Sequence, residues 1–376
     1  MSNVLIINPI LYTAETNEIP KVDSIKDTMI YTLCMGFLHS GHQVTLIAAR
    51  DYCPVKQEKY PFPVLYLKTV WHKLFLPRCF PYMPGLRRYL KTHTEHDVII
   101  SSEVFATWSY TAARMYPDKT IIWHELAAHN RMLHQIPSKV WYHTVARRLM
   151  RKALVIPRSE AAASFIRQFI RRVSGTVIDH GVDLGKLDRI LASERKEKGK
   201  QFVVVSQLID RKRIHRIIEV FAEFVRGGQE EYKLYIIGSG EREARLRALV
   251  KELQVQEQVV FCGRMTHEQL LPIVASSQAL LVYTCKDNNM VSIVESIAVG
   301  TPVVTTAVPY NAAYIRREAL GVVQDDWTMQ ALQEITADHA YYRENCLRYR
   351  RKLSNDHCAE QFLEIWKQFG GVRCHG

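Results

Sequence analysis

DNNMVSIVESIAVGTPVV, residues 287–304, is the most informative segment of this sequence. Its two carboxylates, Asp287 and Glu295, are eight residues apart, and between them a loop turns into a short apolar helix. Gly300 ends that helix, Pro302 prevents its continuation, and the two valines that follow begin a buried strand. The pattern places an acidic group and the free amides of a helix start at the mouth of a parallel sheet. Nucleotide phosphates bind there because N–H groups and the helix dipole favour an anion.

The bulk composition is that of an ordinary globular protein. The chain has 376 residues, enough for two domains, with 47% hydrophobic and 23% charged residues. Its eight cysteines form no C-x-x-C pair, which argues against a zinc knuckle or a redox pair. The first residues do not resemble a secretory signal, and no apolar run approaches the roughly 20 residues of a membrane span. We therefore expect a cytoplasmic protein.

The net charge of +12 is unevenly distributed along the chain. No acidic residue occurs in residues 59–94 or in residues 126–159, and the first of these stretches interleaves basic residues with aromatic ones. Such a pattern suits an anionic membrane surface, where each cation contributes about 1 kcal/mol and aromatic rings lie at the headgroups. Two alternatives stay open: a site for nucleic acid, and a solvated basic face over core aromatics.

The first half of the chain has the pattern of a parallel sheet. Val4–Ile7 is an apolar strand, Ser24–His39 has helical spacing, and Val44–Ala48 is the next strand after Gly41. A strand, a helix and a second strand in this order form a right-handed βαβ unit. Further strands are predicted at Val64–Leu67, Val98–Ser101, Thr120–Trp123 and, at an edge of the sheet, Leu154–Ile156.

The second half begins the same pattern again. Gln201–Ser206 is a strand, Ile214–Val225 a helix and Lys233–Ile237 a strand that ends in a Gly-Ser-Gly turn. A charged segment of few apolar residues, 191–200, separates the two series. We therefore predict an α/β protein of two Rossmann-like domains, residues 1–178 and 179–355.

Four segments of the second half resemble retaining GT-B glycosyltransferases of the E-x7-E type, which form glycosyltransferase family 4 ("glycosyl transferases group 1"). Residues 287–304 are similar to the E-x7-E region, with Asp in place of its first Glu. Val177–Asp183 resembles the family's N-G-V-D turn, with His180 in place of Asn. Gly238–Glu241 resembles the family's G-x-G-x turn and Val260–Gly263 its V-x-F-x-G strand end, whereas the first half of the chain matches only weakly.

This resemblance implies a GT-B architecture, in which two Rossmann-like domains enclose a deep interdomain cleft and a C-terminal helix, here residues 356–376, crosses back to the first domain. It implies a hexosyltransferase that needs neither a metal ion nor a prosthetic group. The donor would be a nucleotide-diphosphate sugar, and the acceptor a glycan or a lipid-linked molecule in surface polysaccharide or glycoconjugate synthesis. The enzyme would work in the cytoplasm, peripheral to the inner membrane face, and no nucleic acid is expected as a partner.

The resemblance also assigns the donor diphosphate to the loop after Val205. Lys212 stands where the family has a lysine, whereas Gln207 replaces the family's arginine. A fixed cation is needed because the leaving diphosphate gathers negative charge, and such a donor is typically worth about 3–4 kcal/mol. Arg211 and Arg213 are both candidates for the missing charge.

Around the E-x7-E region, the resemblance implies that Glu295 accepts hydrogen bonds from the ribose diol, since a carboxylate offers only acceptors. Asp287 would hold a hydroxyl of the transferred sugar, and the amides of Met290 and Val291 would face the phosphates. The remaining donor-binding candidates are Gly238, Asn288 and Asn289. In the alternative interpretation, Asp287 only caps the helix and Glu295 lies on a solvated face.

His124 is the catalytic candidate of the first half. It follows the predicted strand Thr120–Trp123, at the end of a parallel sheet where ligands bind. The resemblance implies that it holds a sugar hydroxyl, with Glu125 as the residue that orients it, and His129 is the alternative. Two other functions stay open: a nucleotide-sugar epimerase of GT-B fold, and a non-enzymatic basic protein that binds membranes or nucleic acid with a degenerate nucleotide pocket.

Overall fold

The computed structural model consists of two compact units. The first comprises residues 1–181 together with 355–376, and the second comprises residues 182–354. The sequence places the boundaries after residues 178 and 355, and the structure places them after Gly181 and Ser354. The structure describes residues 1–11, 24–54, 58–70, 82–130, 132–193, 199–287 and 289–369.

A parallel six-stranded sheet forms the first unit, in the order β3-β2-β1-β4-β5-β6. Its central strand is buried on both faces, which explains its continuous apolar sequence. The chain turns from one side of β1 to the other after β3, so the strand order reverses beside β1. The strands are β1 (Asn3–Ile7), β2 (Gln43–Ala49), β3 (Val64–Leu67), β4 (Val98–Ser102), β5 (Thr120–His124) and β6 (Leu154–Pro157).

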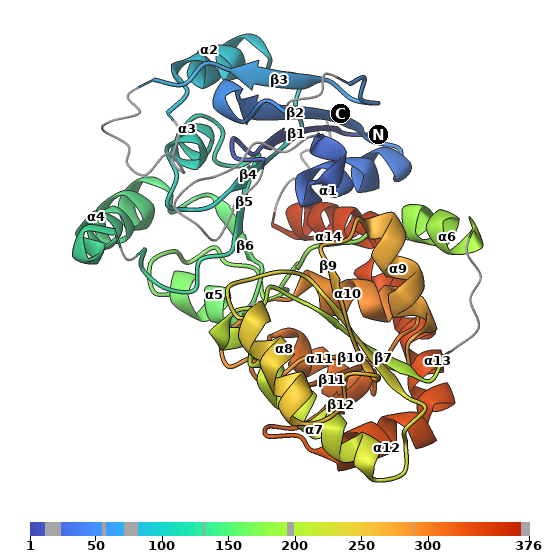
Figure 1. The fold of residues 1–376 in the computed structure, drawn as a ribbon. Helices are drawn as coiled ribbons and strands as arrows, with labels where there is room; N and C mark the ends of the chain where they lie inside the picture. The colour runs from blue at the N-terminus through green and yellow to red at the C-terminus, as the bar shows by residue number, and fades with distance from the viewer. Residues whose placement is uncertain are drawn as a thin grey trace. The chain divides into compact units, whose positions relative to one another are not determined.

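Helices cover this sheet (Figure 1). They are η1 (Ile25–Asp27), α1 (Met29–His39), η2 (Arg50–Tyr52), α2 (Pro84–Thr92), α3 (Thr107–Met115), η3 (Met132–Gln135), α4 (Ile136–Trp141), the π-helical η4 (Tyr142–Leu149), α5 (Glu160–Ile166) and α14 (Asn355–Gln368). The predicted single helix Ser24–His39 is wrong at its start. Thr28 is extended, and its hydroxyl accepts a hydrogen bond from the amide of Tyr31, so α1 begins only at Met29.

The last described helix belongs to the first unit, because α14 packs against α1. A Cβ atom on Gly36 would lie 2.2 Å from the carbonyl oxygen of Asn355, so only glycine allows this close approach. The Asn355 side-chain amide donates to the carbonyl of Thr32 at 3.0 Å. Phe362 of α14 then reaches the core of the first sheet beside Phe37.

The second unit is also built on a parallel six-stranded sheet, in the order β12-β11-β10-β7-β8-β9. Its strands are β7 (Gln201–Val205), β8 (Lys233–Ile237), β9 (Val259–Gly263), β10 (Ala279–Leu281), β11 (Val303–Thr305) and β12 (Gly321–Val323). Its helices are α6 (Leu184–Ser193), η5 (Asp210–Lys212), α7 (Ile214–Arg226), α8 (Glu243–Glu252), α9 (His267–Ser276), α10 (Val291–Ala298), α11 (Asn311–Arg317), α12 (Met329–Ala337), α13 (His339–Tyr349) and η6 (Arg350–Leu353).

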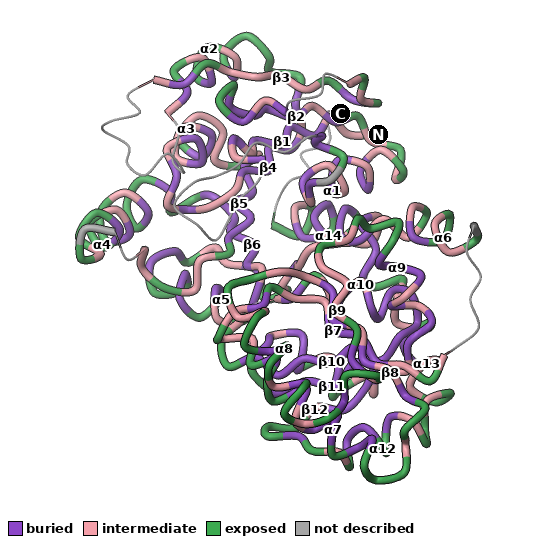
Figure 2. The backbone as a smooth tube through the Cα atoms, viewed as in Figure 1, coloured by how far each residue is buried: buried purple, intermediate pink, exposed green. Residues whose placement is uncertain are grey.

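In both units the central strands are buried, the edge strands β3 and β9 are partly exposed, and the outer helix faces are exposed (Figure 2). Separate apolar clusters lie on the two faces of the second sheet, one beneath α7 and α12 and one beneath α9 and α10. The predicted fold class, an α/β protein of two Rossmann-like domains, is confirmed. β6 lies at the edge of its sheet, as predicted.

Candidate functional site

The loops after β7 and β10 meet at the carboxyl edge of the second sheet. These strands are neighbours, and the chain runs from β7 outward to β9 before it returns to β10 on the other side. Open α/β sheets bind ligands outside the carboxyl ends of their strands, where the strand order reverses. The sequence candidates Lys212 and Asp287 lie on these two loops.

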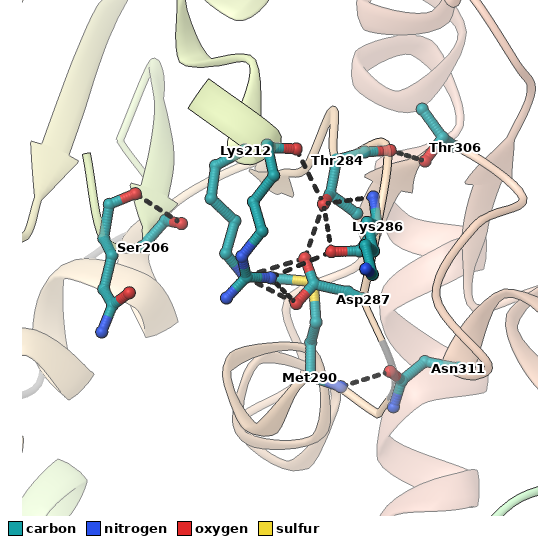
Figure 3. Close-up of polar contacts among 10 residues, drawn as sticks. Ser206, Lys212, Thr284, Lys286, Asp287, Met290, Thr306 and Asn311 are labelled. Atoms are coloured by element: carbon teal, nitrogen blue, oxygen red, sulfur yellow. Dashed lines mark hydrogen bonds and ion pairs between the residues drawn. The ribbon is translucent and has the colours of Figure 1, made fainter. Parts of the chain in front are cut away.

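The carboxylate of Asp287 is the centre of a polar cluster (Figure 3). Lys212 Nζ donates to both carboxylate oxygens at 2.9 Å, and the Arg211 guanidinium donates to Oδ1 at 2.5 Å. The Thr284 hydroxyl donates to Oδ2 at 2.5 Å. The side chains of Asp287 and Lys212 are each only 11% exposed, so water screens this ion pair weakly.

The main chain of Arg211 binds the two loops together. Its carbonyl oxygen accepts a hydrogen bond from the amide of Cys285 at 2.9 Å and lies 3.1 Å from the Thr284 hydroxyl, whose single proton is donated to Asp287. Its guanidinium also donates to the carbonyl of Lys286 at 2.9 Å. Of the two arginines that could replace the family's missing cation, Arg211 is therefore the one whose side chain reaches Asp287. Arg213 adopts a left-handed backbone conformation and caps α7.

At the start of α10, one backbone amide already has a hydrogen-bond acceptor and two do not. The Met290 amide, which the sequence assigns to the donor phosphates, instead donates to Asn311 Oδ1 at 2.6 Å, and Asn311 is buried. Among the described residues, the amides of Val291 and Ser292 have no hydrogen-bond acceptor. An anion at this helix start would therefore bind to these two amides. Asn289 precedes them, and Asn288 lies outside the described residues.

Glu295 lies on α10 with its side chain 14% exposed. Its Oε1 is 2.8 Å from Nε2 of His267, the first residue of α9. The hydrogen bond that the His267 ring donates to Glu295 raises the pKa of His267, and the attraction of that carboxylate adds to the effect, although burial opposes it. The sequence gives no sign of this partner, because His267 is 28 residues away on another helix.

The Gly-Ser-Gly turn after β8 lies directly against the loop after β7. A Cβ atom on Gly238 would be 1.8 Å from the carbonyl oxygen of Ser206, and one on Gly240 would be 2.4 Å from that of Leu208. Gly238 also has a φ of +138°, which L side chains rarely adopt. These glycines thus fix the backbone that carries Gln207, whose side chain is exposed.

His124 ends β5 in the first unit, and its side chain has no exposed surface. Its Nδ1 is 2.9 Å from Oε2 of Glu103. Burial acts to raise the pKa of Glu103, but His124 and the amide of Glu125 outweigh it, so the pKa is lowered and the carboxylate is ionised. The ring of His124 lies against Tyr142 and Phe165. The predicted catalytic histidine is therefore the partner of a carboxylate in an aromatic core.

Glu125 does not orient His124 as the sequence suggests. It forms an ion pair with Arg158 at 2.7 Å, while its own amide donates to Glu103 Oε1 at 2.8 Å. Arg158 stacks on the Trp123 ring at 4.2 Å and donates to Nδ1 of His180 at 2.8 Å. Burial, and then the charge of Arg158, hold the pKa of His180 well below its usual value, so this imidazole is neutral.

The two stretches without acidic residues, 59–94 and 126–159, differ in the structure. In the first, Tyr60, Phe62 and Tyr66 belong to the core of the first sheet or pack against it, and residues 71–81 lie outside the described residues. In the second, α4 and η4 expose apolar side chains, namely Ile136, Val140 and Leu149. The basic side chains beside them are also exposed, namely Lys139, Arg147, Arg148, Arg151 and Lys152.

The described residues contain neither a metal-binding cluster nor a membrane-spanning helix. No cluster of three or more His, Cys, Asp or Glu side chains there could hold a metal ion. No helix in the same part of the chain is both long and apolar enough to cross a lipid bilayer.

Two family models match consecutive parts of the chain. The model described as Glycosyltransferase Family 4 matches residues 27–186, and the model described as Glycosyl transferases group 1 matches residues 188–339. The chain belongs to the family 4 type of glycosyltransferases. The predicted family is thereby confirmed.

Two curated relatives of this glycosyltransferase match part of it. Alpha-monoglucosyldiacylglycerol synthase of Streptococcus pneumoniae is 23% identical over 180 residues, which are 45% of this chain and 41% of the relative. N-acetyl-alpha-D-glucosaminyl L-malate synthase of Bacillus anthracis is 26% identical over 112 residues, 30% of this chain and 28% of the relative. The matches thus span less than half the length of these relatives.

Solved structures share the fold over nearly the whole chain. HepE of Anabaena, solved with UDP and glucose, superposes with a TM-score of 0.64 at 15% identity, covering 98% of this chain and 100% of that one. WaaG, a glycosyltransferase of lipopolysaccharide biosynthesis, gives 0.61 at 14% identity over 96% and 99%. Sucrose-phosphate synthase of Thermosynechococcus elongatus gives 0.64 at 17% identity over 98% and 99%. The two-domain GT-B fold is confirmed.

Proposed function

We propose that this glycosyltransferase transfers a hexose or related sugar from a nucleoside-diphosphate sugar, with retention of configuration and without a metal ion. The observation that carries the proposal is the meeting of Lys212 and Arg211 with the loop that precedes α10. Two cations and two open helix amides then lie at the sheet edge where such folds bind nucleotides. The solved structure of a relative in fold, HepE, contains UDP and glucose.

Each part of the cluster has a role in this reaction. The cations and the amides of Val291 and Ser292 stabilise the negative charge that the diphosphate gathers as the glycosidic bond breaks. Asp287 holds a hydroxyl of the sugar, and Glu295 accepts from the ribose hydroxyls.

Retention would follow if the acceptor attacked from the side of the leaving group and the departing phosphate took its proton. Glu103, a carboxylate at the carboxyl end of the first sheet, is already the partner of His124 and is therefore not free to act as a nucleophile.

Lys212→Ala tests the assignment of the cation. Turnover of the nucleotide sugar should fall by roughly 10²–10³, because one fixed donor to the developing charge is lost. Lys251→Ala, which removes an exposed cation from α8, is the matched control and should keep full turnover. Equal turnover in the two variants would refute the role of Lys212. The donor itself can be found by thermal shift with a panel of nucleotides, since a bound ligand stabilises the fold.

His124 takes part in this mechanism only on one condition. Its ring is buried, so it can contact a sugar hydroxyl only if the residues after β5 move when the donor binds. His124→Asn and His129→Asn distinguish the candidates: the catalytic histidine is the one whose loss lowers kcat while the affinity for the nucleotide stays the same. Equal kcat losses would assign both histidines to the aromatic core.

We further propose that the acceptor is lipid-linked and that the exposed face of α4 and η4 meets the cytoplasmic membrane surface. Exposed apolar side chains beside basic ones, with no acid in residues 126–159, suit the headgroup region of anionic lipid. A Streptococcus pneumoniae relative is named a glucosyldiacylglycerol synthase, and its product is a glycolipid.

Liposome sedimentation tests this surface. The wild-type protein should bind vesicles of anionic lipid and should not bind neutral vesicles. Its binding to anionic vesicles should weaken at high salt. Val140→Asp should weaken the binding, whereas Tyr341→Asp, which changes an exposed apolar residue of α13 in the second unit, should leave it intact. Equal binding to neutral and anionic vesicles would contradict the proposal.

A further inference from the structure

We infer that Asp287 competes with the donor's diphosphate for Lys212 and Arg211, and that this competition favours the nucleotide sugar over the nucleoside diphosphate left after transfer. The inference rests on the proposed function and extends it, because it gives Asp287 a second role. It makes Asp287 a residue that determines which nucleotide the site retains.

In the structure, Lys212 and Arg211 bind a carboxylate of the protein itself. The Asp287 carboxylate accepts two hydrogen bonds from Lys212 and one from Arg211. A carboxylate offers these cations what a phosphate offers, namely negative charge and oxygen acceptors. The donor site therefore already holds an anion of the protein's own.

The diphosphate has to displace this carboxylate from the two cations. When Lys212 and Arg211 turn to phosphate oxygens, Asp287 loses its cations but keeps the hydrogen bond from the Thr284 hydroxyl. The carboxylate is only 11% exposed, so water restores little of the lost interaction. An under-satisfied buried charge is costly, and the affinity for the diphosphate is reduced by that cost.

The sugar of the donor supplies new hydrogen bonds to the displaced carboxylate. Hydroxyls of the donor sugar can donate hydrogen bonds to Asp287 and take the place of the cations. The intact nucleotide sugar therefore replaces the hydrogen bonds that the carboxylate lost, whereas the nucleoside diphosphate does not. Once the sugar has left for the acceptor, Asp287 returns to Lys212 and promotes release of the product, a step that limits the rate of many enzymes.

The sign of one measurement separates this role from a simple supporting role. If Asp287 only held Lys212 in place for the phosphate, its removal would weaken the binding of nucleoside diphosphates. If Asp287 competes, its removal tightens that binding. Asp287→Asn is the suitable change, because the amide keeps the size of the side chain and an acceptor for Thr284 while it loses the charge.

The experiment is calorimetric titration of the full chain with UDP and with UDP-glucose, or with the GDP and ADP pairs if the uridine pair does not bind. Asp287→Asn should bind the diphosphate about tenfold more tightly than the wild type, a coupling of ordinary size, and should bind the nucleotide sugar no more tightly. Asp210→Asn is the matched control: Asp210 lies on the same loop as Lys212, the substitution changes the net charge equally, and Asp210 pairs with Arg242 instead of with Lys212.

Different results would overturn the competition at Asp287 and the proposed donor. Unchanged or weaker binding of the diphosphate in Asp287→Asn, or equal tightening in Asp210→Asn, would overturn the competition while the donor site stands. A wild type that binds none of these nucleotides would overturn the proposed donor and the inference together. If circular dichroism shows that Asp287→Asn does not fold, Asp287→Ser provides the same comparison.

Discussion

Gly238→Ala should damage the donor site through the backbone alone. Alanine at this position has to adopt a φ of +138°, and its Cβ would lie 1.8 Å from the carbonyl oxygen of Ser206. A positive φ costs an L residue of order 1–3 kcal/mol, and overpacking adds typically 1–3 kcal/mol. The collision is with main chain, which cannot turn aside as a flexible side chain can, so we expect a total loss of about 2–6 kcal/mol.

The same collision should also lower the turnover of the enzyme. The displaced carbonyl belongs to the loop that carries Lys212, and a shift of about 1 Å in a positioned group can lower the rate about 10²-fold. We therefore expect both lower stability and lower turnover, although Gly238→Ala removes no charged group.

Urea denaturation measures the first effect. With a slope of about 1–3 kcal/mol per molar urea, a loss of roughly 3 kcal/mol should lower the midpoint by about 1–3 M. Hydrogen exchange of β7 and β8 then assigns the loss to the second unit. Gly228→Ala is the matched control, because Gly228 lies in the same unit at a φ of +96° with no atom within 4 Å. An equal loss in the two variants would refute the argument from close approach.

Three further changes test individual contacts. Glu103→Gln should lose about 1–3 kcal/mol of stability at neutral pH; because the folded-state pKa of Glu103 is lowered, acid denaturation should show this deficit shrinking as the pH falls from the usual glutamate pKa of about 4.3 through the lowered pKa, where the wild-type carboxylate becomes protonated too. Glu295→Gln should lower the pKa of His267 in an NMR titration, and calorimetry should show weaker binding of the nucleotide; an unmoved His267 titration would exclude the hydrogen bond. Asn311→Ala should cost about 1–3 kcal/mol in thermal unfolding, since it leaves a buried amide at the start of α10 without its acceptor.

The sequence predicts the sheet strands well because parallel strands are buried on both faces and appear as short apolar runs. Val64–Leu67 has the predicted bounds in the structure, and Thr120–Trp123 extends by one residue to His124. The sequence does not predict the strand Gly321–Val323, because a three-residue segment that begins with glycine is too short to show a hydrophobic pattern. The π-helical turn of η4 has no signal in the sequence either.

The candidate site is predictable only as far as each residue belongs to a motif. Lys212 and Asp287 lie in motifs, and the structure brings them together. Thr284, His267 and Glu103 lie in none, since their partners are set by how one loop or helix lies against another. The sequence alone cannot show which amide at the start of α10 is already engaged, because that depends on a side chain from α11.

The contact of α14 with α1 has a consequence for the order of events during synthesis. The ribosome makes α1 early and α14 more than 300 residues later, as the separation of Thr32 and Asn355 shows. The second unit is contiguous in sequence, so it can acquire its native state while the polypeptide is still growing. The nascent first unit must leave the surface around Gly36 uncovered until its last helix emerges, and during that interval it is the part of the molecule that a chaperone would protect.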